Sequence, residues 1–217
     1  MSRDLGTILR RAAREPGAAL SYAFARLRGE WYRIWLPLRG RRFTAGRGLQ
    51  VRGRLDVRGP GRVVLGDRVQ VWGTVTPWTY RRDSVIEIGT NTRLGGTRLG
   101  CVASITIGRD CILADCRLMD SDFHSVHANR HDDDAPIRVA PIVIEDNVWI
   151  AATAGIMPGT TIGRNSVVSF GSVCSGRFPS DVIILGNPAR VAGKVPGAEP
   201  AAPAPAAPPA ADPALRG

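Results

Sequence analysis

The sequence of 217 residues lacks a long uncharged apolar run. About 18 such residues are needed to span a bilayer, so no membrane-spanning helix is predicted. Four arginines within the first fourteen residues, at positions 3, 10, 11 and 14, also interrupt the apolar stretch that a secretory signal peptide requires. The sequence therefore predicts a cytoplasmic protein.

Cysteine is scarce and lysine is almost absent. The four cysteines, at positions 101, 111, 116 and 174, include no C-x-x-C pair, which argues against a structural zinc site and against a disulfide framework. We expect reduced thiols that act as small buried apolar groups. Lys194 is the only lysine, so arginine carries almost all of the positive charge.

The positive charge is concentrated at the start of the chain. The formal net charge is +10, and residues 1–47 hold eleven arginines against Asp4, Glu15 and Glu30. We call residues 1–47 the leader. A basic leader favours an anionic partner, such as a membrane surface, a nucleic acid or another protein, and says little about the main domain.

A six-residue repeat dominates the rest of the sequence. Five aliphatic residues follow one another at intervals of six, and Cys174 continues the series. They are Ile144, Ile150, Ile156, Ile162 and Val168. Shorter runs with the same spacing lie upstream at Cys101–Ile107–Leu113–Met119, Ile88–Leu94, Leu65–Val71 and Val51–Val57.

A period of six matches neither a helix nor a simple alternating strand, but it matches a three-walled prism. Each wall then directs one aliphatic side chain inward, and successive coils stack as parallel strands. The sequence predicts an all-β, left-handed parallel β-helix over residues 48–178, an exception to the usual right-handed crossover. Residues 179–195 should pack on the last coils. The Pro/Ala-rich residues 196–217 are predicted to be disordered.

The leader predicts an amphipathic helix that Pro37 should end. Its apolar positions recur at steps of three and four: Leu20, Ala23, Phe24, Leu27, Trp31, Ile34, Trp35 and Leu38. This stripe could pack on the prism or on a neighbouring subunit. Alternatively the helix could lie on anionic lipid, with aromatic side chains at headgroup level. Nucleic acid is not an expected partner, because no nucleic-acid-binding fold accompanies the charge.

The repeat is interrupted once, by a segment that holds all three histidines of the protein. The six-residue spacing stops after Met119 and resumes at Ile144, and we predict a functional loop at residues 123–141. An extended backbone would place Asp120, Asp122 and His124 on one side. His124 is the candidate general base, with a carboxylate fixing its tautomer. The other two histidines, His127 and His131, are interpreted as surface residues.

Residues 85–195 resemble the hexapeptide-repeat O-acetyltransferases, in particular the maltose/galactoside acetyltransferase type and its relatives in polysaccharide biosynthesis. The resemblance rests on the V-W-I run at residues 148–150, the D-x-D-x-H strand end at residues 120–124 and the closing G-N-P-A-R at residues 186–190. It implies a homotrimer that binds acetyl-CoA between adjacent prisms. No metal is expected.

The same resemblance implies roles for individual residues. His124 would take the proton from an acceptor hydroxyl that attacks the thioester directly. The backbone N–H of Ala152 would bind the oxyanion, and Trp149 would line the acetyl pocket. In this sequence Phe170 occupies the expected small-residue slot, and Arg177 replaces a phosphate-facing lysine. The candidate CoA-binding residues are Ala152, Ser169, Phe170, Ser175, Gly176, Arg177, Arg190 and Lys194.

The function implied by the resemblance is acetyl transfer to a hydroxyl of a sugar in a surface polysaccharide or its lipid-linked precursor. The leader would bring the enzyme to the inner face of the cell membrane. A nucleotide-linked amine is an alternative acceptor, because a general base can also deprotonate an ammonium. A γ-type carbonic anhydrase would need three converging histidines, and one loop is poor geometry for them. A non-enzymatic scaffold is the third alternative.

Overall fold

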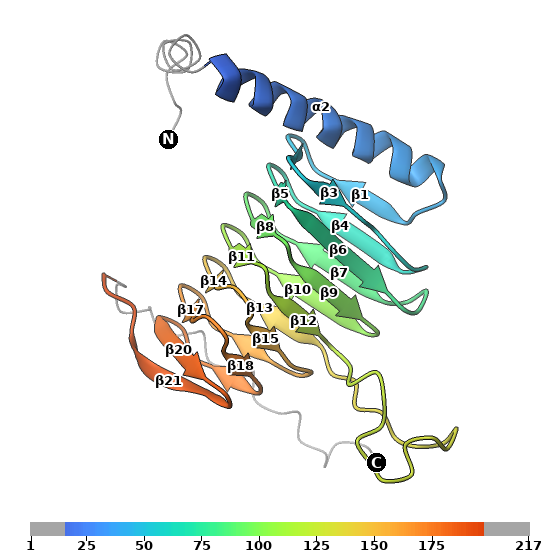
Figure 1. Cartoon of the computed structure of the whole chain (residues 1–217), viewed down its shortest axis with the longest axis vertical. Helices are drawn as coiled ribbons and strands as arrows, with labels where there is room; N and C mark the ends of the chain where they lie inside the picture. The colour runs from blue at the N-terminus through green and yellow to red at the C-terminus, as the bar shows by residue number, and fades with distance from the viewer. Residues whose placement is uncertain (1–15, 198–217) are drawn as a thin grey trace, which may run out of the picture.

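The computed structural model describes residues 16–197 as one helix followed by a three-walled solenoid (Figure 1). The helix is α2 (Pro16–Leu38), and the chain then enters the solenoid at β1. Most of the predicted Pro/Ala-rich tail lies outside the described residues. No helix within residues 16–197 is long and apolar enough to cross a membrane.

The strands form three sheets, which we call walls 1, 2 and 3, and the chain visits them in that order in every coil. Wall 1 contains β1 (Phe43–Ala45), β4 (Arg62–Leu65), β7 (Val85–Ile88), β10 (Ser104–Ile107), β13 (Ile142–Ile144), β16 (Thr161–Ile162) and β19 (Arg177–Phe178). Wall 2 contains β2 (Gln50–Val51), β5 (Gln70–Trp72), β8 (Arg93–Gly95), β11 (Ile112–Ala114), β14 (Trp149–Ile150), β17 (Val167–Val168), β20 (Val182–Gly186) and β21 (Ala189–Lys194). Wall 3 contains β3 (Arg54–Leu55), β6 (Thr74–Thr79), β9 (Arg98–Cys101), β12 (Arg117–Met119), β15 (Gly155–Ile156) and β18 (Val173–Cys174).

Neighbouring strands within each wall pair in parallel, except that β21 pairs antiparallel with β20 at the end of wall 2. The predicted parallel β-helix with an N-terminal helix is confirmed. We name the edges of the prism by the walls they join, so that corner 2–3 lies between walls 2 and 3, and corner 3–1 between walls 3 and 1.

The six-residue repeat places one aliphatic side chain of each short strand inside the prism. All five residues of the unbroken series are at most 1% exposed. The inward residues stack directly on their counterparts in the adjacent coils, as in Ile107–Ile144–Ile162, Leu113–Ile150–Val168 and Leu118–Ile156–Cys174. Each buried side chain of this size stabilises the fold by roughly 1.5–3 kcal/mol, so the repeat is also the core.

The corner between walls 1 and 2 is turned by residues in the left-handed backbone region. Asn91, Asp110, Asn147 and Asn165 have φ between 56° and 63° there. Asn and Asp tolerate this conformation better than other residues with a Cβ. Their side chains also bond along the stack, because Asn147 Nδ2 donates to Asn165 Oδ1 at 3.0 Å. These residues therefore turn the chain and link successive coils.

The four cysteines are free and buried within the solenoid, as the sequence predicts. Burial raises the pKa of the Cys116 and Cys174 thiols to about 12, and it also raises the pKa of Cys101 and Cys111. A raised pKa keeps the thiol protonated at neutral pH, and the thiolate is the reactive form.

We expect the folded protein to resist alkylation of its cysteines at pH 7 to 8, and all four cysteines to react once it is unfolded in urea. Mass spectrometry after a timed maleimide reaction measures both states. Labelling of the native protein at the rate of a free cysteine would contradict the burial of these thiols.

The helix α2 lies across the N-terminal end of the solenoid (Figure 1), but with a different face toward it than the apolar stripe predicts. The contact face is made by Ala25, Gly29, Tyr32 and Leu36. Gly29 decides the orientation, because a Cβ at this position would collide with the backbone of Leu49. The interpretation that the stripe covers the prism is therefore wrong, and the larger apolar side chains point away from the coils.

Replacing Gly29 with alanine should displace α2 from the solenoid. We expect Gly29→Ala to lower the free energy of unfolding by about 1–3 kcal/mol, the usual cost of overpacking, and to expose α2 to trypsin. Gly17→Ala is the matched control, because nothing lies within 4 Å of the added Cβ. Equal stability of the two variants in urea denaturation would argue against the close contact.

Candidate active site

The interruption of the repeat forms a loop at corner 3–1, between β12 and β13 (Figure 1). Its two ends pair with each other. The Asp122 N–H donates to the Arg138 carbonyl at 3.1 Å, and the Ala140 N–H donates to the Asp120 carbonyl at 2.9 Å. Arg138 also donates from Nη2 to the carbonyl of Pro158 in the next coil, at 2.9 Å. The base of the loop is thus fixed to the solenoid.

Asp120 anchors the loop to the preceding coil. Its side chain is fully buried, and its Oδ1 and Oδ2 accept hydrogen bonds from the backbone N–H groups of Val102 at 2.7 Å and Ala103 at 2.8 Å. The Sγ of Cys101 lies 3.4 Å from Oδ2 and donates to it. A buried carboxylate needs such partners to offset the loss of hydration. These bonds occupy both oxygens of the Asp120 carboxylate.

The prediction that Asp120, Asp122 and His124 lie on one side of an extended segment is therefore wrong. Phe123 has a φ of 59°, which turns the chain between Asp122 and His124. Asp122 is half-buried, whereas the His124 side chain is exposed. Of the two carboxylates, only that of Asp122 remains open to interact with an imidazole. An exposed imidazole can reach a hydroxyl on a bound acceptor and remove its proton.

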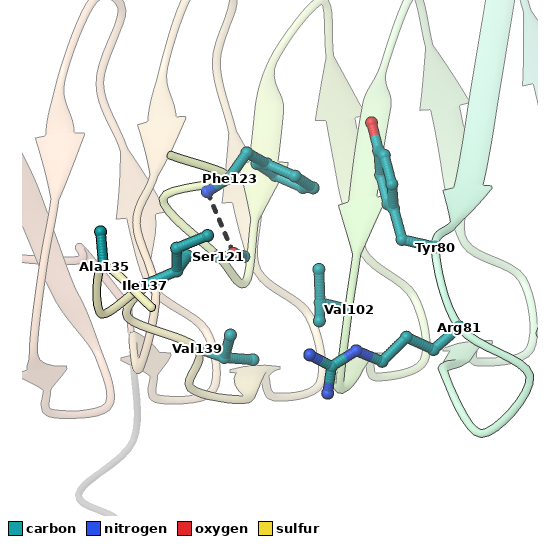
Figure 2. Close-up of a pocket in the computed structure, with 8 residues that line it drawn as sticks. All are labelled: Tyr80, Arg81, Val102, Ser121, Phe123, Ala135, Ile137 and Val139. Atoms are coloured by element: carbon teal, nitrogen blue, oxygen red, sulfur yellow. Dashed lines mark hydrogen bonds between the residues drawn. The ribbon is translucent and has the colours of Figure 1, made fainter. Parts of the chain in front are cut away.

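A pocket lies at the same corner, on the side of the loop that faces the N-terminal coils. Its volume is about 390 Å³. The loop and two preceding coils contribute its lining: Tyr80, Arg81, Val102, Ser121, Phe123, Ala135, Ile137 and Val139. Figure 2 shows the Phe123 ring directed toward Tyr80 and the Arg81 side chain reaching toward the loop. The Phe123 N–H donates to Ser121 Oγ at 3.0 Å, which holds this turn.

An aromatic row continues from this pocket along wall 3. The rings of Tyr80 and Phe123 are 4.6 Å apart, and those of Trp78 and Tyr80 are stacked at 5.0 Å with an interplanar angle of 10°. The guanidinium of Arg58 lies 5.2 Å from the Trp78 ring centre. Sequence reasoning missed these residues, although Trp78 lies in β6 and Tyr80 directly follows that strand, and residues two apart in an extended segment point to one face.

The predicted oxyanion and acetyl-pocket residues lie at a different edge, on wall 2 and corner 2–3. The Ala152 carbonyl accepts from the Gly171 N–H at 3.1 Å. Among the described residues, the Ala152 N–H has no acceptor. Trp149 points outward from wall 2 and is 48% exposed, and Phe170 is 69% exposed at corner 2–3. A free N–H at this corner can bind a developing oxyanion.

The remaining predicted CoA-binding residues fall into separate groups. Ser169 lies beside Phe170 at corner 2–3, after β17. Ser175 and Gly176 lie at corner 3–1, and Arg177 begins β19. Arg190 and Lys194 lie on β21, where both side chains are exposed. Ser175 and Gly176 thus share corner 3–1 with the His124 loop, whereas the full width of wall 3 separates Ser169 and Phe170 at corner 2–3 from His124.

Residues 16–197 hold no cluster of three or more histidine, cysteine, aspartate or glutamate side chains that could bind a metal ion. His127 and His131 are exposed in the loop. The loop histidines of one chain therefore do not provide the converging ligands that a metal site needs.

Comparisons with known proteins identify the repeat. Residues 141–176 match the family described as bacterial transferase hexapeptide (six repeats). Over 163 residues the chain is 28% identical to the putative lipopolysaccharide biosynthesis O-acetyl transferase WbbJ of Escherichia coli K12, which covers 71% of this chain and 70% of that protein. Residues 141–176 carry the hexapeptide repeat of bacterial transferases, and the comparisons support an acyltransferase.

Two further proteins resemble this acyltransferase. It is 35% identical over 88 residues to galactoside O-acetyltransferase of Escherichia coli K12, covering 41% of this chain and 43% of that enzyme. The crystal structure of the polySia-specific acetyltransferase NeuO matches with a TM-score of 0.55 and 25% identity, over 70% of this chain and 81% of that one. The acyltransferase thus spans most of WbbJ and less than half of the galactoside enzyme. The matched repeat begins after His124 and therefore does not include the loop that carries it.

The buried carboxylate of Asp120 should be a positioning group. We expect Asp120→Asn to lower the free energy of unfolding by about 1–3 kcal/mol. The Nδ2 of asparagine is a donor, so it cannot accept the hydrogen bond from one of the two backbone N–H groups. Asp122→Asn, at a half-buried side chain, should have a much smaller effect on stability. Urea denaturation followed by circular dichroism measures both variants. A change in the pH–rate profile of Asp120→Asn without a loss of stability would instead indicate direct pairing with His124.

Proposed function

We propose that this acyltransferase moves an acetyl group from acetyl-CoA to a hydroxyl of a sugar in a surface polysaccharide or its lipid-linked precursor. The observation that carries the proposal is the exposed His124 on an anchored loop beside an aromatic pocket, in a hexapeptide-repeat acyltransferase. The similarity to WbbJ and NeuO supports a glycan acceptor. It supports the same acyl-transfer chemistry for this chain.

The proposed reaction is a direct transfer. His124 accepts the proton of the acceptor hydroxyl as its oxygen forms a bond to the thioester carbonyl carbon. The resulting oxyanion accepts a hydrogen bond from the Ala152 N–H. Collapse of this intermediate breaks the C–S bond, and the thiolate of CoA takes the proton back from His124. Asp122 is the carboxylate available to orient the imidazole, and Asp120 fixes the loop that carries it.

We propose that the active site is shared by two chains of a homotrimer. His124 and Ala152 lie at opposite edges of wall 3, so their joint action requires one chain's corner 3–1 to meet a neighbour's corner 2–3. Three prisms packed side by side would provide three such clefts. Acetyl-CoA would then lie along the last coils, lined by Trp149, Phe170 and the other predicted residues. The exposed Arg177, Arg190 and Lys194 would face its phosphates.

The pocket at corner 3–1 is the proposed acceptor site. Ligand pockets combine an apolar or aromatic lining with a few polar groups that fix orientation. Here Tyr80 and Phe123 provide aromatic surface for the sugar ring, and Arg81 provides a cation for a carboxylate on the sugar. Arg81→Gln should therefore raise KM for acidic glycans more than for neutral ones.

The catalytic role of His124 has a direct test. We expect His124→Ala to reduce kcat/KM by about 10²–10⁴-fold, the usual contribution of a general base. His127→Ala, which removes an exposed histidine from the same loop, should retain nearly full activity. Release of CoA in the presence of candidate glycans, followed with a thiol reagent, measures both variants. An unchanged rate in His124→Ala would remove this mechanism.

The shared site predicts complementation between two inactive variants. Ala152→Pro removes the proposed oxyanion donor, because proline has no N–H, whereas Ala152→Ser keeps it and serves as the control. Mixing Ala152→Pro with His124→Ala under conditions of subunit exchange should restore part of the activity, since some clefts receive an intact His124 and an intact residue 152. A mixture that stays inactive, with both variants folded and exchanging, would contradict a site between chains.

A further inference from the structure

The outward face of α2 is the largest set of exposed apolar side chains on one element of the described structure. Eight large apolar or aromatic side chains along the helix are between 40% and 74% exposed, and seven of them lie on one face. They are Leu20, Phe24, Leu27, Trp31, Ile34, Trp35 and Leu38. We call them the outer face of α2. A contiguous apolar patch of this kind marks an interaction surface on a soluble protein.

The position of α2 leaves this face free of the solenoid. The helix crosses the N-terminal end of the stack, and the coils lie on its opposite side (Figure 1). The contact with the coils is made by small or half-buried residues around Gly29. The outer face is therefore presented at one end of the molecule, away from both corners that carry the candidate catalytic groups.

The side chains on the outer face are of the types that lie at a membrane interface. The rings of Trp31 and Trp35 are stacked with centroids 5.6 Å apart, and the guanidinium of Arg39 lies 5.5 Å from the Trp35 ring centre. Tryptophan is enriched at headgroup depth, where its ring contacts the acyl boundary and its N–H stays hydrated.

The helix and the residues that follow it are rich in arginine. Residues 16–47 contain seven arginines and one acidic residue, Glu30, which pairs with Arg33. Arg28 and Arg41 donate to the carbonyls of Gly53 and Gly59 in the coils, whereas the Arg39 guanidinium lies against the Trp35 ring of the outer face. An apolar helix face on an arginine-rich segment, with Arg39 beside Trp35, is complementary to a bilayer that carries anionic headgroups.

We propose that the outer face of α2 binds the surface of an anionic lipid bilayer, with the helix lying in the plane of the interface. The same net charge disfavours pairing with a second copy, because two identical arginine-rich segments would repel each other. Nucleic acid would neutralise the arginines and leave the apolar face uncovered. A bilayer satisfies both features. This inference does not depend on the acetyl-transfer reaction or on the trimer.

Binding of the full-length protein to lipid vesicles tests the proposal. We expect the protein to sediment with vesicles of phosphatidylcholine and phosphatidylglycerol, and to bind vesicles of phosphatidylcholine alone much more weakly. Added salt should weaken binding, because it screens the arginines. The double variant Leu27→Ser/Ile34→Ser should bind at least tenfold more weakly, since two apolar side chains no longer leave water.

Two matched variants separate the apolar contribution from the charge and from general surface effects. Leu185→Ser/Val191→Ser changes two side chains that are also about half exposed but lie on β20 and β21. It should bind vesicles like the natural protein. Arg39→Gln should weaken binding to anionic vesicles about fivefold, the effect of one basic residue near such a surface, and should not change binding to neutral ones.

Tryptophan fluorescence provides a second readout. Emission should shift to shorter wavelength when anionic vesicles are added, and the double variant Trp31→Phe/Trp35→Phe should lose most of this shift. Because all of the changed α2 side chains are exposed, the variants should keep the melting temperature of the natural protein.

Three results would overturn the proposal. The natural protein could fail to bind anionic vesicles, or Leu27→Ser/Ile34→Ser could bind them equally well. Light scattering could also show that the double variant has a smaller assembly than the natural protein, which would assign the outer face to a contact between copies. Vesicle binding with no acetyl transfer would leave this inference intact and contradict only the proposed activity.

Discussion

The inward stacking of one aliphatic side chain on each wall of every coil is the interaction on which the rest of the molecule depends. Each coil buries its apolar residues only against the coils above and below it. Ile150, for example, is covered by Leu113 and Val168 of the adjacent coils. Because the walls have no room for extra residues, a long insertion can leave the solenoid only at a corner.

That constraint explains how an exposed catalytic side chain can be held in position. The loop leaves at corner 3–1 and is fixed on both sides, through Asp120 to the preceding coil and through Arg138 to the following one. His124 itself makes no part of the core, so its imidazole is free to contact a substrate. The pocket forms where the loop folds back on Tyr80 and Val102 of the earlier coils. The regular solenoid therefore holds the base of the loop in place, and the loop carries the proposed general base.

The three-walled cross-section also separates surfaces that the function must combine. Wall 3 divides the proposed base from the proposed oxyanion donor, and the outer face of α2 lies at the end of the stack. A prism has no deep cleft of its own, because its interior is filled by the stacked side chains. Substrate binding in the proposed site depends on the neighbouring chain that packs beside the prism. The proposed membrane contact depends on α2, which covers the end of the prism.

The sequence alone determined the fold. A six-residue apolar period matches the inward positions of a three-walled solenoid, and it does not match the period of a helix or of a simple alternating strand. It also located the loop, since the period stops after Met119 and resumes at Ile144. Only the tertiary structure decided where three groups point. Asp120 bonds the preceding coil, α2 turns its apolar stripe outward because Gly29 admits the Leu49 backbone, and Phe123 meets Tyr80. Each of these orientations depends on contacts between residues distant in sequence or on a positive φ. A local apolar pattern contains no information about either.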